Sequence, residues 1–452
     1  MKNQNQLINN NNFYLLSLGC AKNLVDSESM SQILKNEGYI SVNQPDTARF
    51  LIVNTCGFIG SAKEEAIAAI LELAEYKQSG DNRFLIVTGC LPQRYARDIQ
   101  STLPEVDAVV GTADYGRIAE VFQQLDQGQT CLAVPGPGGS LEHLNIARTP
   151  STPGHYAYLK IAEGCSNNCS YCAIPGIRGP YQSRPEDEIM KEARHLTQLG
   201  YDELILIAQD TTRYGQDLYG KKTICHLLEK ICELPDVRLV RLLYVYPDSM
   251  TDQLIDTLAN QPKIAPYLDM PVQHASDRIL KKMNRRDSAE SMLALIEKLR
   301  SRIPGLVLRS TVMVGFPGET AADQKALLAF LQRVRFDRLG CFIFSPEEDT
   351  PAFNMQPRVR KQTAENRYQA VMKLQKAITQ EANLKRIGQV IPVTLESVDD
   401  LGIFYLGRSY GEAPDVDPVI YVAAAEPGLT IGQTVKVRLV ESSEYDFTGV
   451  TL

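Results

Sequence analysis

Short apolar runs recur along the first third of the chain, and three of them end in a cysteine. They are Phe13 to Cys20, Arg49 to Cys56 and Arg83 to Cys90, and each is followed by turn residues and a helical pattern. Strands that alternate with helices predict a doubly wound parallel sheet. Because the carboxyl ends of parallel strands meet at one edge of such a sheet, we expect Cys20, Cys56 and Cys90 to lie together there.

The same alternation resumes in the middle of the chain. Six apolar runs separated by helical stretches predict a partial (βα)6 barrel, which stays open because it lacks the eight strands of a closed one. The runs are 156–162, 204–208, 237–245, 266–270, 307–314 and 340–344. Functional residues of such barrels gather at the carboxyl ends of strands. Gln209, Gln273 and Gly315 occupy such positions, so we take them as candidate ligand-binding residues.

After a long charged helical pattern at 361–386, short alternating strands take over. They are expected at 390–395, 404–408, 419–422, 434–440 and 445–448, and this pattern predicts a small all-β, OB-like barrel. Folds of this kind often bind RNA through a basic surface. Residues 388–452 instead contain ten acidic and three basic residues, which makes nucleic acid an unfavourable partner.

Changes in composition predict the domain boundaries. Residues 1–12 are rich in Asn, lack an apolar stretch and are expected to form a disordered tail before an N-terminal domain at 13–134. Pro and Gly are frequent at 135–154, which predicts a linker. The partial barrel is then expected at 155–386 and the small β-barrel at 387–452.

Composition narrows the class of protein. No apolar run approaches the roughly 18 residues that a membrane-spanning helix needs. The chain contains ten cysteines but no secretory signal, which argues against a disulfide framework and for thiols that act as ligands. We therefore expect a soluble, cytoplasmic protein with a net charge of −7.

The most informative stretch is the loop from Glu163 to Cys172, which carries cysteines at C-x3-C-x2-C spacing. The residues between them are few and polar, so Cys165, Cys169 and Cys172 can reach one small object. A structural zinc ion takes four ligands, and no fourth Cys or His lies nearby. A four-iron cluster held by three cysteines keeps one iron open for a reactive ligand. A zinc site completed by a distant residue and three buried thiols remain the alternatives.

This loop and the order of the three parts resemble the radical S-adenosylmethionine (SAM) methylthiotransferases over essentially the whole chain after residue 12. In that family an N-terminal three-cysteine domain precedes a radical SAM barrel and a TRAM domain. The resemblance implies that Cys165, Cys169 and Cys172 hold the 4Fe–4S cluster that binds SAM. It also implies that Cys20, Cys56 and Cys90 hold an auxiliary 4Fe–4S cluster.

Three further runs, 208–215, 268–275 and 344–348, are similar to the RimO branch of this family. The resemblance implies transfer of a methylthio group to the β-carbon of an aspartate in ribosomal protein S-twelve of the small subunit. The sister branch, MiaB, modifies an adenosine of tRNA and is the first alternative. A non-catalytic iron–sulfur electron carrier or sensor is the second. The acidic third domain makes tRNA the less favoured partner.

The implied chemistry is consistent with these residues. Neither an acid nor a base can remove hydrogen from an unactivated C–H bond, so a radical from SAM is needed, and a low-potential cluster can supply the electron. A donor such as flavodoxin is the expected source of that electron, whereas the sulfur donor is not identified. Tyr171 is a candidate for contact with the adenine of SAM or for core packing. Arg178 and Arg184 are candidates for binding a carboxylate of SAM or substrate, or are surface charges.

Overall fold

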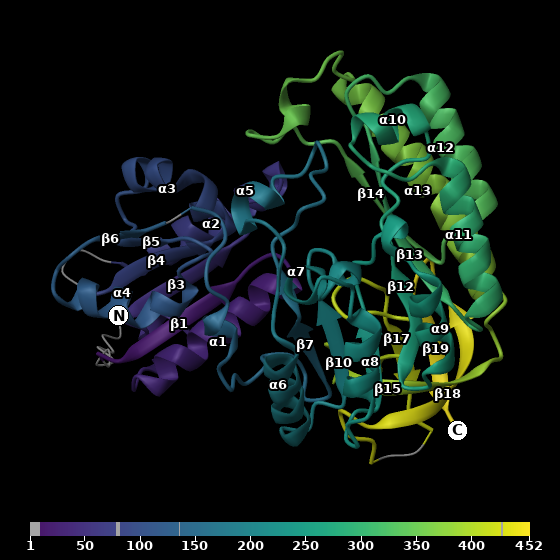
Figure 1. Ribbon diagram of the computed structural model, residues 1–452. Helices are drawn as coiled ribbons and strands as arrows, with labels where there is room; N and C mark the ends of the chain where they lie inside the picture. The colour runs from purple at the N-terminus through teal and green to yellow at the C-terminus, as the bar shows by residue number, and fades with distance from the viewer. Residues whose placement is uncertain (1–9, 78–81, 135, 426–427) are drawn as a thin grey trace.

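The computed structural model describes residues 10–77, 82–134, 136–425 and 428–452, which form three units in chain order (Figure 1). Two six-stranded parallel sheets are followed by a closed five-stranded barrel. The predicted fold class is therefore confirmed. None of the helices in these described segments is both long and apolar enough to cross a membrane.

The first sheet has the strand order β2-β1-β3-β4-β5-β6. Its strands are β1 (Asn12–Ser17), β2 (Ile40–Ser41), β3 (Phe50–Thr55), β4 (Phe84–Gly89), β5 (Ala108–Val110) and β6 (Cys131–Ala133). The helices between them are α1 (Ala21–Asn36), α2 (Gly60–Ala74), α3 (Cys90–Thr102) and α4 (Ile118–Asp126). Every residue of β3 is buried, as expected for a strand with helices on both faces. The strand order reverses at β1, because β2 lies on one side of β1 while β3 and the later strands follow on the other. Doubly wound sheets bind their ligands at such a switch point, here between β1 and β3.

The second sheet has the order β14-β13-β12-β11-β10-β7 and curves into a partial barrel. Its strands are β7 (Tyr156–Lys160), β10 (Glu203–Ile207), β11 (Leu239–Leu242), β12 (Ile264–Asp269), β13 (Val307–Val314) and β14 (Arg338–Ile343). The outer layer consists of α6 (Glu186–Gln198), α8 (Ile224–Cys232), α9 (Asp252–Asn260), α11 (Ala289–Arg302), α12 (Ala321–Val334) and α13 (Lys361–Leu384). The third predicted strand is shorter than expected because Tyr244 adopts a left-handed φ of 60° and leaves the ladder.

Side-chain alternation along these strands separates two cores. Ala157 and Leu159 of β7 pack outward against the helices, whereas Tyr156 and Tyr158 point to the inner face. The inner-face core also contains Ala413, a residue of the third unit. A loop of that unit therefore fills part of the barrel interior.

The third unit is the barrel β15-β16-β17-β19-β18. Its strands are β15 (Val390–Val398), β16 (Tyr405–Arg408), β17 (Ile420–Ala423), β18 (Thr434–Ser442) and β19 (Phe447–Thr451). The last strand begins two residues later than predicted because Ser443 and Asp446 form a hydrogen-bonded turn before it.

The chain segments at the predicted tail and linker are partly structured. β1 already begins at Asn12, and residues 1–9 of the predicted tail lie outside the described residues. Within the predicted linker, the fully buried Arg148 pairs with Glu28 of α1 and with Glu192 of α6. This segment therefore also fastens the first unit to the second.

A second contact joins the first unit to the opposite rim of the barrel. Glu347, which follows β14, accepts hydrogen bonds from Lys63 at 3.0 Å and from Arg94 at 2.8 Å. The Tyr95 hydroxyl donates to the neighbouring Glu348 at 2.8 Å. Together with the ion pairs of Arg148, these bonds attach the first unit to the barrel near both of its edge strands, β7 and β14.

Candidate metal centres

Cys165, Cys169 and Cys172 lie on the loop after β8 (Ala162–Glu163), at the carboxyl end of β7. The loop reverses direction through left-handed backbone at Gly164 and Asn168, with φ of 69° and 53°. A Cβ at Gly164 would collide with the carbonyl oxygen of Pro180, so glycine is required there. The Cys172 N–H donates to the Cys169 carbonyl at 3.1 Å and closes the turn between the last two cysteines.

The ionisation of these thiols indicates what they bind. Burial raises the pKa of Cys165 to about 11 and also raises the pKa of Cys172, and the neighbouring Cys169 thiol adds to both shifts. Burial therefore disfavours the thiolate form, and the positive charge of bound iron would offset that cost. Within the described residues, no three or more His, Cys, Asp or Glu side chains lie close enough together to coordinate one single metal ion. As a donor set, three thiols fit an iron–sulfur cluster, in which each thiolate binds a different iron.

Cys20, Cys56 and Cys90 lie at one edge of the first sheet: Cys56 and Cys90 directly follow β3 and β4, and Cys20 comes three residues after the end of β1. Two glycines pack their loops together. A Cβ at Gly19 would lie 2.8 Å from the Cβ of Cys56, and one at Gly57 would lie 2.9 Å from the carbonyl carbon of Cys90. Burial raises the pKa of Cys56 to about 11 and also raises that of Cys90. This set has the same donor chemistry as the first.

Arg178 connects the two cysteine groups. It ends α5 (Ile174–Arg178), the short helix after the first loop, and its side chain is buried. Its guanidinium donates to Asp26 at 2.7 Å and to Glu163 at 2.8 Å, and Nη2 lies 3.5 Å from the Cys90 sulfur. Burial opposes ionisation of Asp26, but Lys160 and Arg178 hold the pKa of this carboxyl below its usual range. Arg178 thus binds carboxylates of this chain and borders the second cysteine group.

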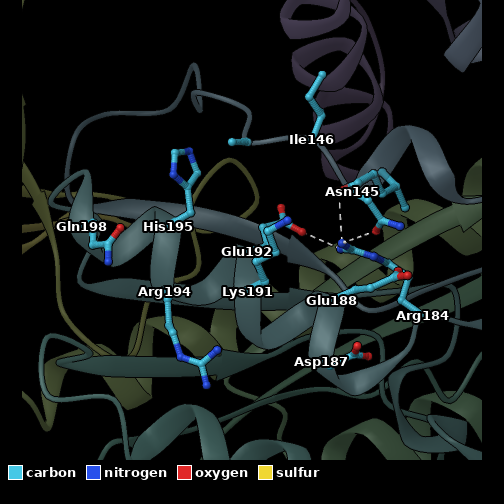
Figure 2. Close-up of a pocket in the computed structure, with 12 residues that line it drawn as sticks. Asn145, Ile146, Arg184, Asp187, Glu188, Lys191, Glu192, Arg194, His195 and Gln198 are labelled. Carbon is cyan, nitrogen blue, oxygen red and sulfur yellow. Dashed lines mark hydrogen bonds and ion pairs between the residues drawn. The ribbon is translucent and has the colours of Figure 1, made fainter.

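Arg184 lies elsewhere, beside a pocket of about 610 Å³ between α6 and residues 144–147 (Figure 2). Its fully buried guanidinium donates to Glu192 at 2.5 Å and to the Lys160 carbonyl at 2.7 Å. Figure 2 shows it directed toward Glu192 and Asn145. These contacts give Arg184 partners within the fold, and the pocket is lined by no cysteine.

Tyr171, Gln209 and Gln273 are at the mouth of the barrel. Gln209 donates to Glu163 at 2.6 Å, and its buried Oε1 has no partner among the described residues. Gln273 has a left-handed φ of 67° and bridges to Val312. Tyr171 is half-buried against a small core that includes Phe316. An unpartnered amide oxygen beside the first cysteine loop fits a site that binds a polar cofactor.

Gly315 has a different local role. Its N–H donates to the Glu319 carboxylate, and a Cβ at this position would lie 2.8 Å from the Cβ of Ala364 on α13. The missing side chain therefore allows the close approach of α13, and contact of this turn with SAM stays a prediction.

Two residues beside the first loop were not among the candidate cofactor-binding residues. The Tyr246 hydroxyl lies 3.8 Å from the Cys169 sulfur, and the Arg285 guanidinium lies 4.5 Å from the centre of the Tyr246 ring. The position of Tyr246 just after a predicted strand was a usable signal. Arg285 lies in a polar turn, and its sequence position carries no such signal.

Comparisons with known proteins agree with this architecture. Residues 12–111 match the model of the Uncharacterized protein family UPF0004, residues 159–331 that of the Radical SAM superfamily, and residues 387–452 that of the TRAM domain. Among solved structures, the radical SAM methyltransferase TsrM from Kitasatospora setae has a TM-score of 0.55 at 14% identity, covering 76% of this chain and 77% of its own. The cobalamin-dependent enzyme OxsB has a TM-score of 0.51 at 13% identity, covering 81% and 56%. These likenesses show the fold.

The partial six-stranded barrel with a three-cysteine loop at its mouth defines a radical SAM protein. Relatives from Acetivibrio thermocellus and Thermoanaerobacter sp., both called ribosomal protein uS12 methylthiotransferase RimO, are 46% and 45% identical to it. The alignments cover 96% and 97% of this chain, and 97% and 99% of the relatives. The chain belongs to the RimO family of radical SAM methylthiotransferases.

Proposed function

We propose that this protein transfers a methylthio group to the β-carbon of an aspartate in ribosomal protein uS12. The observation that carries the proposal is the junction of two three-cysteine groups through Arg178, which is part of the segment after one group and lies 3.5 Å from a thiol of the other. A single cluster would serve only radical formation, whereas a second one provides a place for sulfur. The near full-length identity to RimO proteins supports the same reaction.

In this proposal Cys165, Cys169 and Cys172 hold the cluster that binds SAM, and Cys20, Cys56 and Cys90 hold the auxiliary cluster. When bound, the two 4Fe–4S clusters and SAM supply the electron, the hydrogen-abstracting radical and the sulfur. The chain itself orients these groups. Asp26 and Glu163 fix the guanidinium of Arg178 between the two loops, and Gln209 is held by the same Glu163.

The remaining partners follow from the reaction. The electron comes from a low-potential donor such as flavodoxin, and the protein works in the cytoplasm, where the ribosomal substrate is made. The tRNA-modifying alternative is not favoured, because the relatives act on a ribosomal protein by name. Acidic residues also outnumber basic ones in residues 388–452, which disfavours binding to phosphates.

An in vitro reaction tests the proposal. Protein reconstituted with iron and sulfide is incubated with SAM, a strong reductant and a peptide that carries the target aspartate of uS12. We expect deoxyadenosine and a peptide that has gained one methylthio group, and no product with Cys165→Ala. Deoxyadenosine without any modified peptide, with full iron content in the enzyme, would contradict the proposed function.

A further inference from the structure

One buried cation in the described residues has no anionic partner. Lysine and arginine are rarely buried unless they are paired. Nine buried members of this class do form ion pairs: Arg49, Arg148, Lys160, Arg178, Arg184, Arg241, Arg285, Arg338 and Arg408. Lys22, whose exposed fraction is 8%, forms none among the described residues.

Lys22 lies in the first turn of α1, two residues after Cys20. Its ammonium lies 3.3 Å from the centre of the Tyr244 ring, at the carboxyl end of β11. A ring face attracts the cation but carries no net charge, so the ammonium remains without a neutralising partner. Its place between the first sheet and the barrel strands puts this free charge at the barrel mouth.

The nearby carboxylates are already occupied. Glu163 and Asp269 are close enough to interact electrostatically with Lys22. Glu163, however, pairs with Arg178 at 2.8 Å, and Asp269 pairs with Arg309 at 3.0 Å. Both carboxylates are therefore paired with another cation. The other ionisable groups that interact with Lys22 are the Tyr244 phenol and the Cys20 thiol, and neither is a carboxylate that would compete with one from outside.

A chamber of about 320 Å³ is lined by the two residues before Lys22 and by Tyr244, whose ring the Lys22 ammonium contacts; Lys22 itself is not one of the lining residues. Its walls come from all three units of the molecule: Cys20 and Ala21 next to Lys22, Tyr158 and Tyr244 of the barrel, and Pro414 to Val416 of the third unit. The Asp415 carboxylate in this wall already accepts a hydrogen bond from the Tyr158 hydroxyl at 2.7 Å. The flexible four-carbon stem of lysine allows its ammonium to move from the ring of Tyr244 into the chamber.

We propose that Lys22 binds the side-chain carboxylate of the substrate aspartate in this chamber, an inference that rests on the proposed function. The β-carbon of an aspartate is bonded directly to its carboxylate carbon, so a carboxylate held by Lys22 fixes the position of the reacting carbon. Cys20, a proposed ligand of the auxiliary cluster, is two residues away. Lys22 is thus a specificity-determining residue that selects aspartate over its neutral amide analogue.

Peptide binding tests this role directly. A labelled peptide with the target aspartate and a matched peptide with asparagine in its place are titrated into cluster-loaded protein with SAM, and Kd is read by fluorescence anisotropy. We expect the wild-type protein to prefer the aspartate peptide by about tenfold or more, as is typical of a charge-assisted contact. Lys22→Met should remove this preference by weakening only the aspartate peptide. Lys22→Arg, which keeps the charge, should retain part of it.

The matched control is Lys35→Met, an exposed lysine near the other end of α1, which should keep the full preference. Iron content and Tm confirm that each variant is folded. If Lys22→Met discriminates between the peptides as well as wild type, the inference is overturned. The same holds if wild type does not discriminate but still modifies the aspartate peptide. Failure of the proposed function itself is distinct, because wild type would then modify no peptide at all.

Discussion

At the scale of single residues, the contact between Arg178 and Cys90 is the one most open to measurement. A hydrogen bond to a cluster-bound sulfur withdraws charge from it and raises the reduction potential of the cluster. In Arg178→Lys the charge beside Asp26 and Glu163 is kept, but the second donor that reaches the Cys90 sulfur is lost. We expect the auxiliary cluster to shift to a lower potential, on the order of tens of millivolts.

The measurement is an EPR-monitored redox titration of the reconstituted variant. Arg238→Lys serves as the control, because Arg238 forms only a half-exposed ion pair with Asp202. Equal potentials in wild type and Arg178→Lys would show that the 3.5 Å approach has no electronic effect.

How far sequence reasoning could reach also differs between residues. The two cysteine groups were predictable, because a strand end or a short spacing already brings such thiols together. The role of Arg178 was not, since its partner Asp26 lies 152 positions away in sequence. Lys22 gave no signal either, because a lysine in the first turn of a helix normally points to solvent. Its burial depends on the position of the first unit against β11, which no local pattern encodes.

At the scale of elements, the loop that carries Cys165 depends on close approach of two chain segments. Gly164 has a φ of 69° and no space for a side chain beside Pro180, whereas Gly176 on α5 has no atom within 4 Å of its missing Cβ. Gly164→Ala should therefore force the loop open and lose the iron of one cluster. Gly176→Ala should keep both clusters. Iron and sulfide analysis of the reconstituted variants measures the cluster content. A full iron content in Gly164→Ala would contradict the requirement for glycine at this position.

The strands and helices themselves were largely predictable, because alternating apolar runs mark each one. Their ends were less so. The third barrel strand was expected at 237–245, but β11 stops at Leu242, since the left-handed backbone of Tyr244 turns that residue toward Lys22. Leu243 and Tyr244, which follow the end of β11, both line the chamber. The end of the strand was therefore predicted wrongly at residues that belong to the proposed binding site.

At the scale of the whole molecule, buried ion pairs attach the third unit to the barrel. Burial alone would raise the pKa of Glu203, but the guanidinium groups of Arg408 and Arg241 lower it to about 2. Because its folded pKa is depressed below an unfolded value of 4.5, Glu203 stabilises the fold fully above pH 4.5, and this contribution is lost as the pH falls toward 2. The contribution is about 3 kcal/mol at neutral pH.

Urea denaturation of iron-free protein measures this effect. The difference in unfolding free energy between wild type and Glu203→Gln should be largest at pH 7 and should shrink as the pH drops below 4.5. A difference that stays constant with pH would show that the ionised Glu203 does not hold the third unit in place.

The surface charge of the third unit is smaller than its composition suggests. Of its acidic residues, Glu396 and Glu412 pair with arginines, and Asp417 accepts a hydrogen bond from Tyr267 and lies 3.5 Å from Arg309. Charges available to a basic partner include the exposed Asp400 and Glu441. Replacing both residues by Lys should weaken the association with uS12 and make its affinity less dependent on salt. Titrations at several salt concentrations measure both effects. Unchanged association would make the acidic surface irrelevant to substrate binding.

The central claim is that the two cysteine groups act together on a ribosomal protein. Its most direct test is mass spectrometry of uS12 from cells that lack this gene and are complemented with wild type, Cys165→Ala or Cys90→Ala. Our account predicts that uS12 gains the mass of one methylthio group in place of one hydrogen, on a single aspartate, only with wild type. Modified uS12 in cells that carry either cysteine variant, or unmodified uS12 with wild type, would contradict it.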